Sequence, residues 1–306
     1  MCAGATLLVV VCWVFASAWV GIWGSHPAGL VTLGVCTLGA MGLIAWSWFG
    51  GPPRLRPRRI RWLARGALVV LTGLLVATIL YTRPFSAQQV ALDALADGGG
   101  VTVGESWTQI RLQPDEPLRT AVAFYPGAKV DPQAYTHVLR PVAEAGYPVV
   151  IFKQPYNLAI LDGDAADSVI GDGYDEVDRW VIGGHSLGGA MAARYGEEMR
   201  DELVGLLLYG AYPVNDMSAR SDLAVMSVSG TNDALADVAD IEASVSELPA
   251  TAEYVAIAGG IHSFFGDYGA QKGDGTPTIP RQRAQDQIAL ATLQLLGSIE
   301  RTAPAD

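Results

Sequence analysis

A serine set between closely spaced glycines is the first feature of this sequence that could perform covalent chemistry. The pattern G-x-S-x-G occurs at Gly184, Ser186 and Gly188, between an apolar run and a segment of helical spacing. In such a nucleophile elbow the serine backbone is strained, and the glycines let the neighbouring strand and helix approach closely. We interpret Ser186 as a nucleophile. The alternative is an ordinary serine in a glycine-rich turn.

A serine nucleophile requires a base, and the base requires an acid that orients it. Asp233 and His262 follow the serine in the order acid then histidine, and each comes directly after an apolar run. The acid could instead be Asp237 or Asp240, and His262 could instead be a surface-loop histidine. Three other histidines are placed less well, in the N-terminal third, in a predicted helix and beside the serine: His26, His137 and His185.

This order of residues predicts acyl transfer through a covalent intermediate on the serine. His262 would take the hydroxyl proton, Asp233 would hold the imidazole tautomer, and water would later release the acyl group. The oxyanion requires two backbone N–H donors. We assign one to Leu187 and the other to the loop after the first buried strand, where we choose Ala128 over Gly127.

Alternating strand-like and helix-like patterns surround these residues. Six short apolar runs are typical of strands buried on both faces: 121–125, 149–152, 180–182, 206–209, 223–228 and 254–257. Four segments between or after them have helical spacing: 132–145, 187–200, 236–248 and 281–299. Before them, 87–96 is predicted as a helix and 108–112 as an exposed antiparallel strand. The alternation predicts an α/β fold with a mostly parallel sheet, helices on both faces, and a ligand site at the carboxyl ends of the strands.

The N-terminal residues 1–83 differ from the rest in composition. They contain no acidic residue, whereas the following part holds all 31 Asp and Glu against 13 of the 20 Lys and Arg, a net charge of −18. Three apolar stretches, 5–23, 28–49 and 66–81, are close to the roughly 20 residues that cross a bilayer. We predict three transmembrane helices in a multi-pass anchor, followed by one domain over 84–306. The alternative for the first stretch is a cleaved signal peptide.

Six arginines between Arg54 and Arg65 separate the second and third stretches. The positive-inside rule keeps this segment in the cytoplasm, which predicts a domain outside the cytoplasm that is tethered to the lipid of the cell membrane. The acidic domain would repel a phosphate backbone, so no nucleic-acid partner is expected. All three cysteines lie in the anchor (Cys2, Cys12 and Cys36), so we expect neither disulfides nor thiol catalysis in the domain.

No metal and no organic cofactor are expected. The sequence has no Cys/His cluster, H-E-x-x-H motif or P-loop, and no dinucleotide fingerprint in a strand context. Lys129 and Lys153 follow predicted strands and could bind an anionic substrate group, or they are surface lysines. The segment 158–173 is too short for a large lid, which predicts a small or open pocket. We interpret the acidic run 162–178 as a solvated loop.

From residue 119 to 299 the chain resembles α/β-hydrolases, and more narrowly the small bacterial branch related to dienelactone hydrolases. The resemblance is carried by Tyr125–Val130, Gly184–Gly189, Gly230–Asp233, Gly259–His262 and Phe265–Gly269. It implies a Ser-His-Asp hydrolase and says little about the substrate, which we expect to be a small-molecule acyl compound. Dienelactone hydrolases use a cysteine where this chain has Ser186, which argues against a dienelactone substrate. Many relatives also have His-Gly where this chain has Tyr125-Pro126-Gly127.

The expected function is therefore a membrane-anchored, extracytoplasmic serine hydrolase that cleaves carboxylic esters or related acyl compounds. An acyltransferase with the same triad is one alternative, because the acceptor is selected by the dryness and shape of the pocket. A non-catalytic binding protein on a hydrolase fold is another. Such a protein would be expected to lack a triad member, and this sequence has all three.

Overall fold

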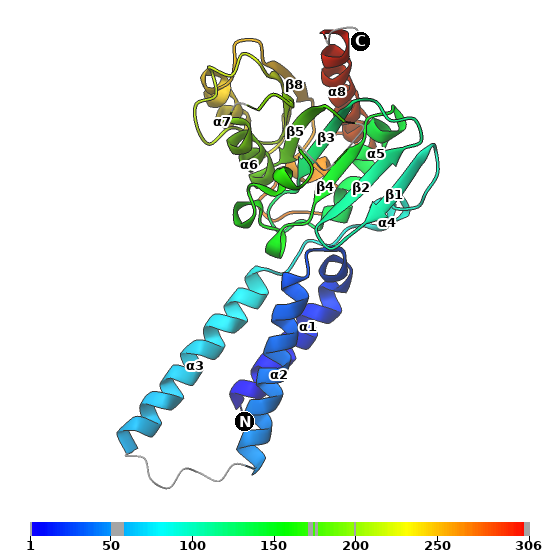
Figure 1. Ribbon diagram of the computed structural model, residues 1–306. Coiled ribbons are helices and arrows are strands. Elements are labelled where there is room, and N and C mark those ends of the chain that lie inside the picture. The colour runs from blue at the N-terminus through cyan, green and yellow to red at the C-terminus, as the bar shows by residue number, and fades with distance from the viewer. Residues whose placement is uncertain (1, 50–57, 171–173, 175–176, 199, 303–306) are drawn as a thin grey trace.

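Three long helices project from an α/β domain in the computed structural model, which describes residues 2–49, 58–170, 174, 177–198 and 200–302 (Figure 1). The three are α1 (Cys2–Gly24), α2 (Ala28–Phe49) and α3 (Arg58–Tyr81). All are long and apolar enough to cross a membrane, by length and composition. At about 1.5 Å per residue they exceed a hydrocarbon core of about 30 Å.

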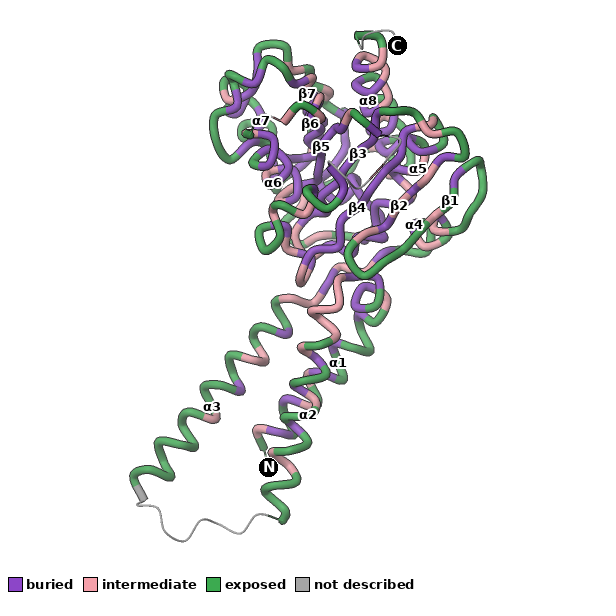
Figure 2. Tube along the Cα trace, viewed as in Figure 1, coloured by how far each residue is buried: buried purple, intermediate pink, exposed green. Residues whose placement is uncertain are grey.

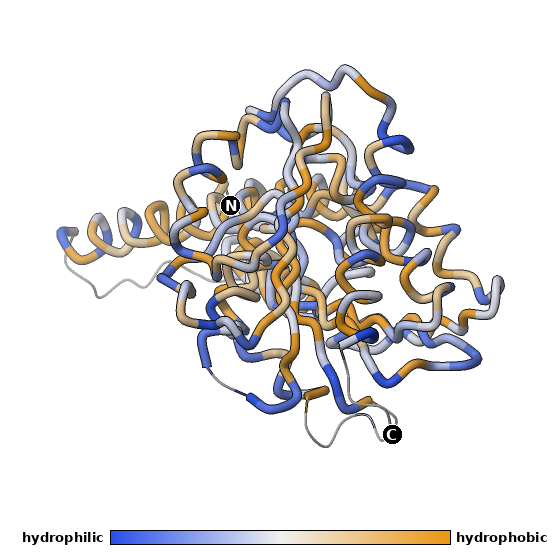
Figure 3. Tube along the Cα trace, turned by 90° about the horizontal axis from the view of Figure 1, so that it is seen from above, coloured by the Kyte–Doolittle hydropathy of each residue, from blue (hydrophilic) through white to orange (hydrophobic). Residues whose placement is uncertain are grey.

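The third helix starts earlier than its apolar run predicted, at Arg58 rather than residue 66. Arginine has a high helix propensity, so the basic residues before the apolar run continue the helix. Seen from above, α3 is hydrophilic where it begins and hydrophobic along most of its length (Figure 3). Arg54 and Arg56 of the predicted cytoplasmic segment lie outside the described residues.

Helix α1 is the centre of the bundle and contacts both α2 and α3. Its buried side chains Leu7, Val11 and Val14 recur every three or four residues and face a cluster that includes Ala40 of α2. Most other side chains of α2 and α3 are exposed apolar groups (Figure 2). A bundle with so much apolar surface is suited to lipid rather than water.

The domain is built on one eight-stranded sheet. Its strands are β1 (Val101–Glu105), β2 (Gln109–Pro114), β3 (Thr120–Tyr125), β4 (Val149–Phe152), β5 (Arg179–His185), β6 (Leu203–Tyr209), β7 (Ala224–Gly230) and β8 (Glu253–Ile257). Their order in the sheet is β1-β2-β4-β3-β5-β6-β7-β8. Strands β3 to β8 are parallel, and β1 and β2 pair antiparallel at one edge.

Helices cover both faces of the sheet, as predicted. They are α4 (Gln89–Asp93), α5 (Thr136–Glu144), α6 (Leu187–Gly196), α7 (Val238–Ala243) and α8 (Arg281–Thr302). Side chains of α5 and α8 share one apolar cluster with the inward side chains of β3 and β4, and α6 belongs to a second cluster on the opposite face. Each central strand is therefore buried on both sides, which explains its continuous apolar sequence.

Several element predictions require correction. Strand β1 has no apolar pattern and was not predicted. The strand predicted over 108–112 is not exposed: β1 and β4 pair with it on either side, and the apolar cluster that includes side chains of α5 buries Ile110 and Leu112 completely. Strand β8 is an edge strand with exposed residues rather than a fully buried one, since only β7 pairs with it.

The predicted helices are generally longer than the observed ones. The segment 132–145 opens with a 3-10 turn, Pro132–Tyr135, before α5. Helix α4 is shorter than the predicted 87–96, α6 ends at Gly196 rather than at residue 200, and α7 is shorter than the predicted 236–248. Apolar spacing continues through turns that pack on the sheet, so it does not mark where a helix ends.

The connection between β5 and α6 depends on two glycines. A Cβ atom on Gly188 would collide with the carbonyl oxygens of Tyr125 and Pro126, at the end of β3. A Cβ atom on Gly184 would collide with the backbone of Gly188. The helix therefore starts in direct backbone contact with two strands, and no larger residue fits without moving backbone.

Gly188→Ala is expected to destabilise the full chain by about 3 kcal/mol or more, because backbone rather than a flexible side chain would have to move. Thermal unfolding of the protein in detergent measures this loss. The matched control is Gly104→Ala in β1, where an added Cβ meets no atom within 4 Å. Equal melting temperatures for the two variants would contradict this account of the turn.

Candidate active site

The three side chains predicted for catalysis lie at one edge of the sheet. Ser186 directly follows β5, Asp233 follows β7 and His262 follows β8. These strands are parallel, so their carboxyl ends share an edge. Open α/β sheets bind ligands at this edge.

Ser186 has the backbone conformation of a sharp strand-to-helix turn. Its φ is 54° and its ψ is −126°, a left-handed region that non-glycine residues rarely occupy. Its N–H donates to the carbonyl of Tyr209 at the end of β6 (3.0 Å), and α6 begins at the next residue. The side chain is partly exposed, whereas the preceding residue, His185, is buried. A strained serine at a helix start is the arrangement of a nucleophile elbow.

Asp233 and His262 form a buried hydrogen-bonded pair. Asp233 Oδ2 lies 2.7 Å from His262 Nδ1, and both side chains are almost wholly inaccessible to solvent. The other carboxylate oxygen, Oδ1, accepts the N–H groups of Leu235 (2.8 Å) and Ala236 (2.9 Å). An ionised carboxylate only accepts hydrogen bonds, so the imidazole Nδ1 carries a proton and Nε2 is left to accept one.

The two other candidate acids have different positions. Asp237 is the N-cap of α7, and its Oδ1 accepts the N–H of Asp240 in the first turn (2.9 Å). This use of Asp237 is a common way to satisfy the unpaired N–H groups at a helix start. Of the three acids, Asp233 is the one that the structure brings to His262.

Glycine at position 210 makes room for this pair. Gly210 follows β6 with a φ of +48°, and a Cβ atom there would lie 3.1 Å from Asp233 Oδ2 and 3.2 Å from His262 Nδ1. A side chain would press on both partners and would strain the left-handed backbone. The end of β6 thus contributes space rather than a functional group.

Asp274 fixes the loop that carries the histidine. Its two carboxylate oxygens accept the N–H groups of His262 (3.1 Å) and Ser263 (2.8 Å). The sequence analysis did not identify Asp274. It lies in a glycine-containing loop without periodic spacing, so no local signal distinguishes it from other acidic residues.

The N–H groups considered as oxyanion donors differ in whether they already make a hydrogen bond within the protein. The N–H of Gly127 donates to the Tyr135 hydroxyl (2.8 Å). Among the described residues no acceptor lies within hydrogen-bond distance of the Ala128 N–H. Leu187 is the first residue of α6, and the first N–H groups of a helix have no intrahelical acceptor. The structure therefore leaves Ala128 and Leu187, rather than Gly127, with N–H groups to offer.

A tyrosine and a second histidine pack beside these residues. The Tyr135 hydroxyl lies 2.9 Å from His185 Nδ1, and the His185 ring lies 4.5 Å from the His262 ring, centroid to centroid. Burial and the neighbouring His262 hold the pKa of His185 well below its ordinary value. His185 is therefore neutral. Its Nδ1 accepts a hydrogen bond from the Tyr135 hydroxyl, and the hydroxyl oxygen accepts a hydrogen bond from the Gly127 N–H. Sequence reasoning missed this contact, because only the folded chain brings Tyr135 to the elbow.

The two lysines considered for anion binding have different surroundings. Lys153 is not a surface residue: its side chain is buried and its Nζ donates to Glu105 Oε1 (2.6 Å). Lys129 Nζ lies 4.8 Å from the ring centroid of Tyr81, at the end of α3. The acidic run 162–178 lies partly outside the described residues, and its first part forms a 3-10 turn at Ala165–Ser168.

Comparisons with known proteins found one matching family model and a set of similar solved structures. The family model of the alpha/beta hydrolase family matches residues 121–286. A CIB-like hydrolase from Thermoplasma acidophilum has 17% identity and a TM-score of 0.49, covering 64% of this chain and 99% of its own. A dienelactone hydrolase-like promiscuous phosphotriesterase from metagenomic libraries has 18% identity and a TM-score of 0.47. The match covers 62% of this chain and 92% of that protein. A dienelactone hydrolase from Anabaena variabilis has 13% identity and a TM-score of 0.46, and the match covers 64% of this chain and 98% of that protein.

A search of curated proteins found no match. The family model spans more than half of the chain. Its range begins in β3 and ends in α8, so it includes the turn at Ser186 and the Asp233–His262 pair. This chain belongs to the alpha/beta hydrolase family.

Proposed function

We propose that this protein is a membrane-anchored serine hydrolase that cleaves carboxylic esters outside the cytoplasm. Ser186 is the nucleophile, His262 the base and Asp233 the acid that orients the base. The observation that carries the proposal is the buried hydrogen bond of 2.7 Å between Asp233 and His262, at the sheet edge where Ser186 directly precedes α6. A carboxylate that holds imidazole in one tautomer is the requirement for general-base activation of a serine.

In the proposed reaction, Ser186 Oγ attacks the ester carbonyl carbon while His262 Nε2 takes the hydroxyl proton. The carbonyl oxygen becomes an oxyanion and accepts hydrogen bonds from the N–H groups of Leu187 and Ala128. Collapse of this intermediate breaks the bond to the alkoxy group, which leaves with the proton from His262. Water then attacks the acyl-serine, again with His262 as base, and releases the acid and free Ser186.

The proposed side of the membrane follows from the ends of the bundle. The end of α1, the start of α2 and the end of α3 lie at the end of the bundle next to the domain, and the end of α2 and the start of α3 lie at the opposite end (Figure 1). The described part of the arginine-rich segment, which begins α3, therefore lies at the end of the bundle remote from the domain. Retention of this segment in the cytoplasm supports a domain on the outer side.

Ser186→Ala and His262→Ala are each expected to lower kcat for a short activated ester by about 10⁴-fold or more, because each removes a member of one proton-transfer unit. The assay uses the full chain in detergent and follows release of the chromogenic alcohol. Both variants should melt within a few degrees of the wild type. Substantial turnover by a folded Ser186→Ala variant would contradict the assignment of the nucleophile.

Asp233→Asn is expected to reduce kcat by about 10² to 10⁴-fold, since an asparagine can present the wrong tautomer to His262. Asp237→Asn is the matched control. Asparagine remains a good N-cap for α7, so kcat should stay close to the wild-type value. The assignment of the acid fails if the larger loss of kcat belongs to Asp237→Asn.

The orientation of the protein is testable with single cysteines. After the three native cysteines are replaced by serine, an impermeant maleimide should label Arg283→Cys, an exposed position on α8, in intact cells. It should label Arg54→Cys only after lysis, because positive charge holds that segment in the cytoplasm. The reverse labelling pattern would place the domain inside the cell.

A further inference from the structure

Residues next to the ends of the membrane helices are hydrogen-bonded, through Asn157 or directly from Phe85, to the loop that carries the proposed oxyanion donor. From these contacts we infer that the anchor positions this loop, with Ser25 and Asn157 as positioning residues, so that the membrane helices are a structural part of the catalytic site. The inference rests on the proposed function, because it assigns the Ala128 N–H to the oxyanion.

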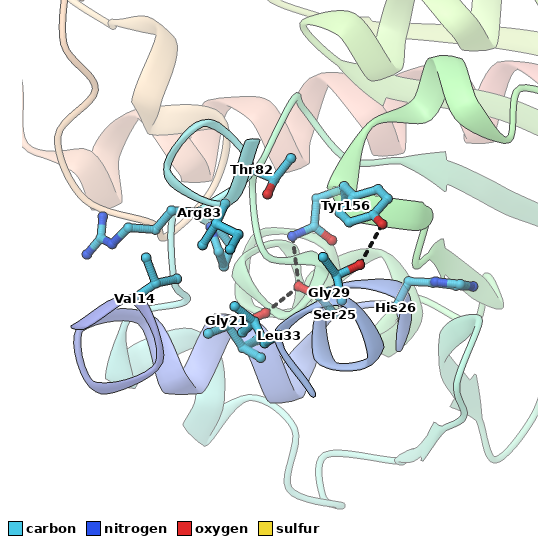
Figure 4. A pocket seen from close by; sticks show the side chains of 14 residues that line it. Val14, Gly21, Ser25, His26, Gly29, Leu33, Thr82, Arg83 and Tyr156 are labelled. Carbon is cyan, nitrogen blue, oxygen red and sulfur yellow. Dashed lines mark hydrogen bonds between the residues drawn. The ribbon is translucent and has the colours of Figure 1, made fainter. Parts of the chain in front are cut away.

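The first connection runs from the turn between α1 and α2. The Asn157 side-chain amide donates to Ser25 Oγ (2.7 Å), and Ser25 Oγ in turn donates to the carbonyl of Gly21 in α1. Both Ser25 and Asn157 are buried. Figure 4 shows this chain of hydrogen bonds at the top of the bundle, at the wall of a pocket that residues of α1, α2 and α3 also line.

The backbone of Asn157 is in turn hydrogen-bonded to the loop that carries Ala128, here called the oxyanion loop. Its carbonyl accepts the N–H of Lys129, the residue after Ala128 (2.7 Å). Asn157 has a φ of +54° and Lys129 a φ of 61°, so both backbones are held in the left-handed region. Asparagine adopts this region more readily than most residues do. Lysine rarely adopts it, so the backbone conformation of Lys129 depends on the contacts that hold it.

The second connection comes from the segment that leaves α3. Phe85 donates its N–H to the Lys129 carbonyl (2.8 Å), and its own carbonyl accepts the N–H of Asp131 (3.0 Å). Asp131 Oδ2 accepts the N–H of Ala87 (3.0 Å) from the same segment. The Lys129 ammonium lies over two rings, at 4.8 Å from Tyr81 and 5.4 Å from Phe85. The exit of the third helix is thus paired with the loop like a short strand.

Ala128 lies between two residues that are held from outside the loop. On one side the Tyr135 hydroxyl accepts the N–H of Gly127. On the other side Asn157 accepts the N–H of Lys129, and Phe85 donates to its carbonyl. An oxyanion donor must be within about 0.2 Å of its working distance, and a shift of about 1 Å can cost about 10²-fold in rate. Loss of an anchor contact is therefore expected to act on kcat through the position of Ala128.

The test compares Ser25→Ala with Thr32→Val in the full chain, reconstituted in phosphatidylcholine nanodiscs. Thr32 Oγ1 makes another hydrogen bond from these helices to the domain, to the Tyr156 hydroxyl at the tip of a side chain (2.7 Å). Each variant loses one hydrogen bond between anchor and domain, but only Ser25 is bonded to the residue that holds Lys129. Ser25→Ala should lower kcat for a water-soluble ester about tenfold with KM unchanged, and Thr32→Val should leave both values within twofold.

Two further variants separate positioning from a general loss of stability. Ser25→Thr keeps the hydroxyl and should restore kcat, and Asn157→Gly keeps the left-handed backbone but loses the amide, so it should match Ser25→Ala. Melting temperatures should be alike for Ser25→Ala and Thr32→Val. Equal kcat values for these two variants, or no rescue by Ser25→Thr, would overturn the inference. Absence of ester turnover in the wild type would instead overturn the proposed function.

Discussion

The buried hydrogen bond between Asp233 and His262 places the strongest demand on the rest of the domain. A carboxylate removed from water is costly unless it is hydrogen-bonded, and here the backbone amides of Leu235 and Ala236 add two bonds to the one from His262. The two partners come from loops 29 residues apart, so β7 and β8 must end side by side for the pair to form. Gly210 supplies the space for it, and Asp274 holds the histidine loop in place.

The anchor adds a second constraint, on the opposite side of the nucleophile. The loop after β3 is bonded to residues that leave α3 and to the loop after β4, which is in turn bonded to the turn between α1 and α2. Backbone hydrogen bonds join Lys129 to Phe85 and to Asn157, and a side-chain hydrogen bond joins Asn157 to Ser25. The long apolar helices and the sheet therefore meet at the loop proposed to bind the oxyanion, rather than through a free linker.

The sequence predicted the features that depend on neighbouring residues and missed those that depend on residues far apart in the chain. Continuous apolar runs located β3 to β7 within a few residues, and the glycines around Ser186 indicated the strand-to-helix turn, because both patterns are local. Strand β1 escaped prediction because its alternation is weak and its pairing with β2 supplies its order.

The contacts around the site depend on the folded chain in the same way. The burial of Lys153 follows from its pairing with Glu105, 48 residues earlier in the chain. The contact of Tyr135 with His185 joins residues 50 positions apart. Neither pair shares a local pattern that sequence reasoning could read, so neither could be expected before the sheet was assembled.

Activation of Ser186 is the central claim, and direct identification of the modified residue tests it most directly. The full chain in detergent would be treated with a fluorophosphonate and digested, and the adduct would be located by tandem mass spectrometry. The account predicts one phosphonylated residue, Ser186, with modification suppressed when His262 is replaced by alanine. An unmodified Ser186 in folded wild-type protein, or an adduct on another residue, would contradict it.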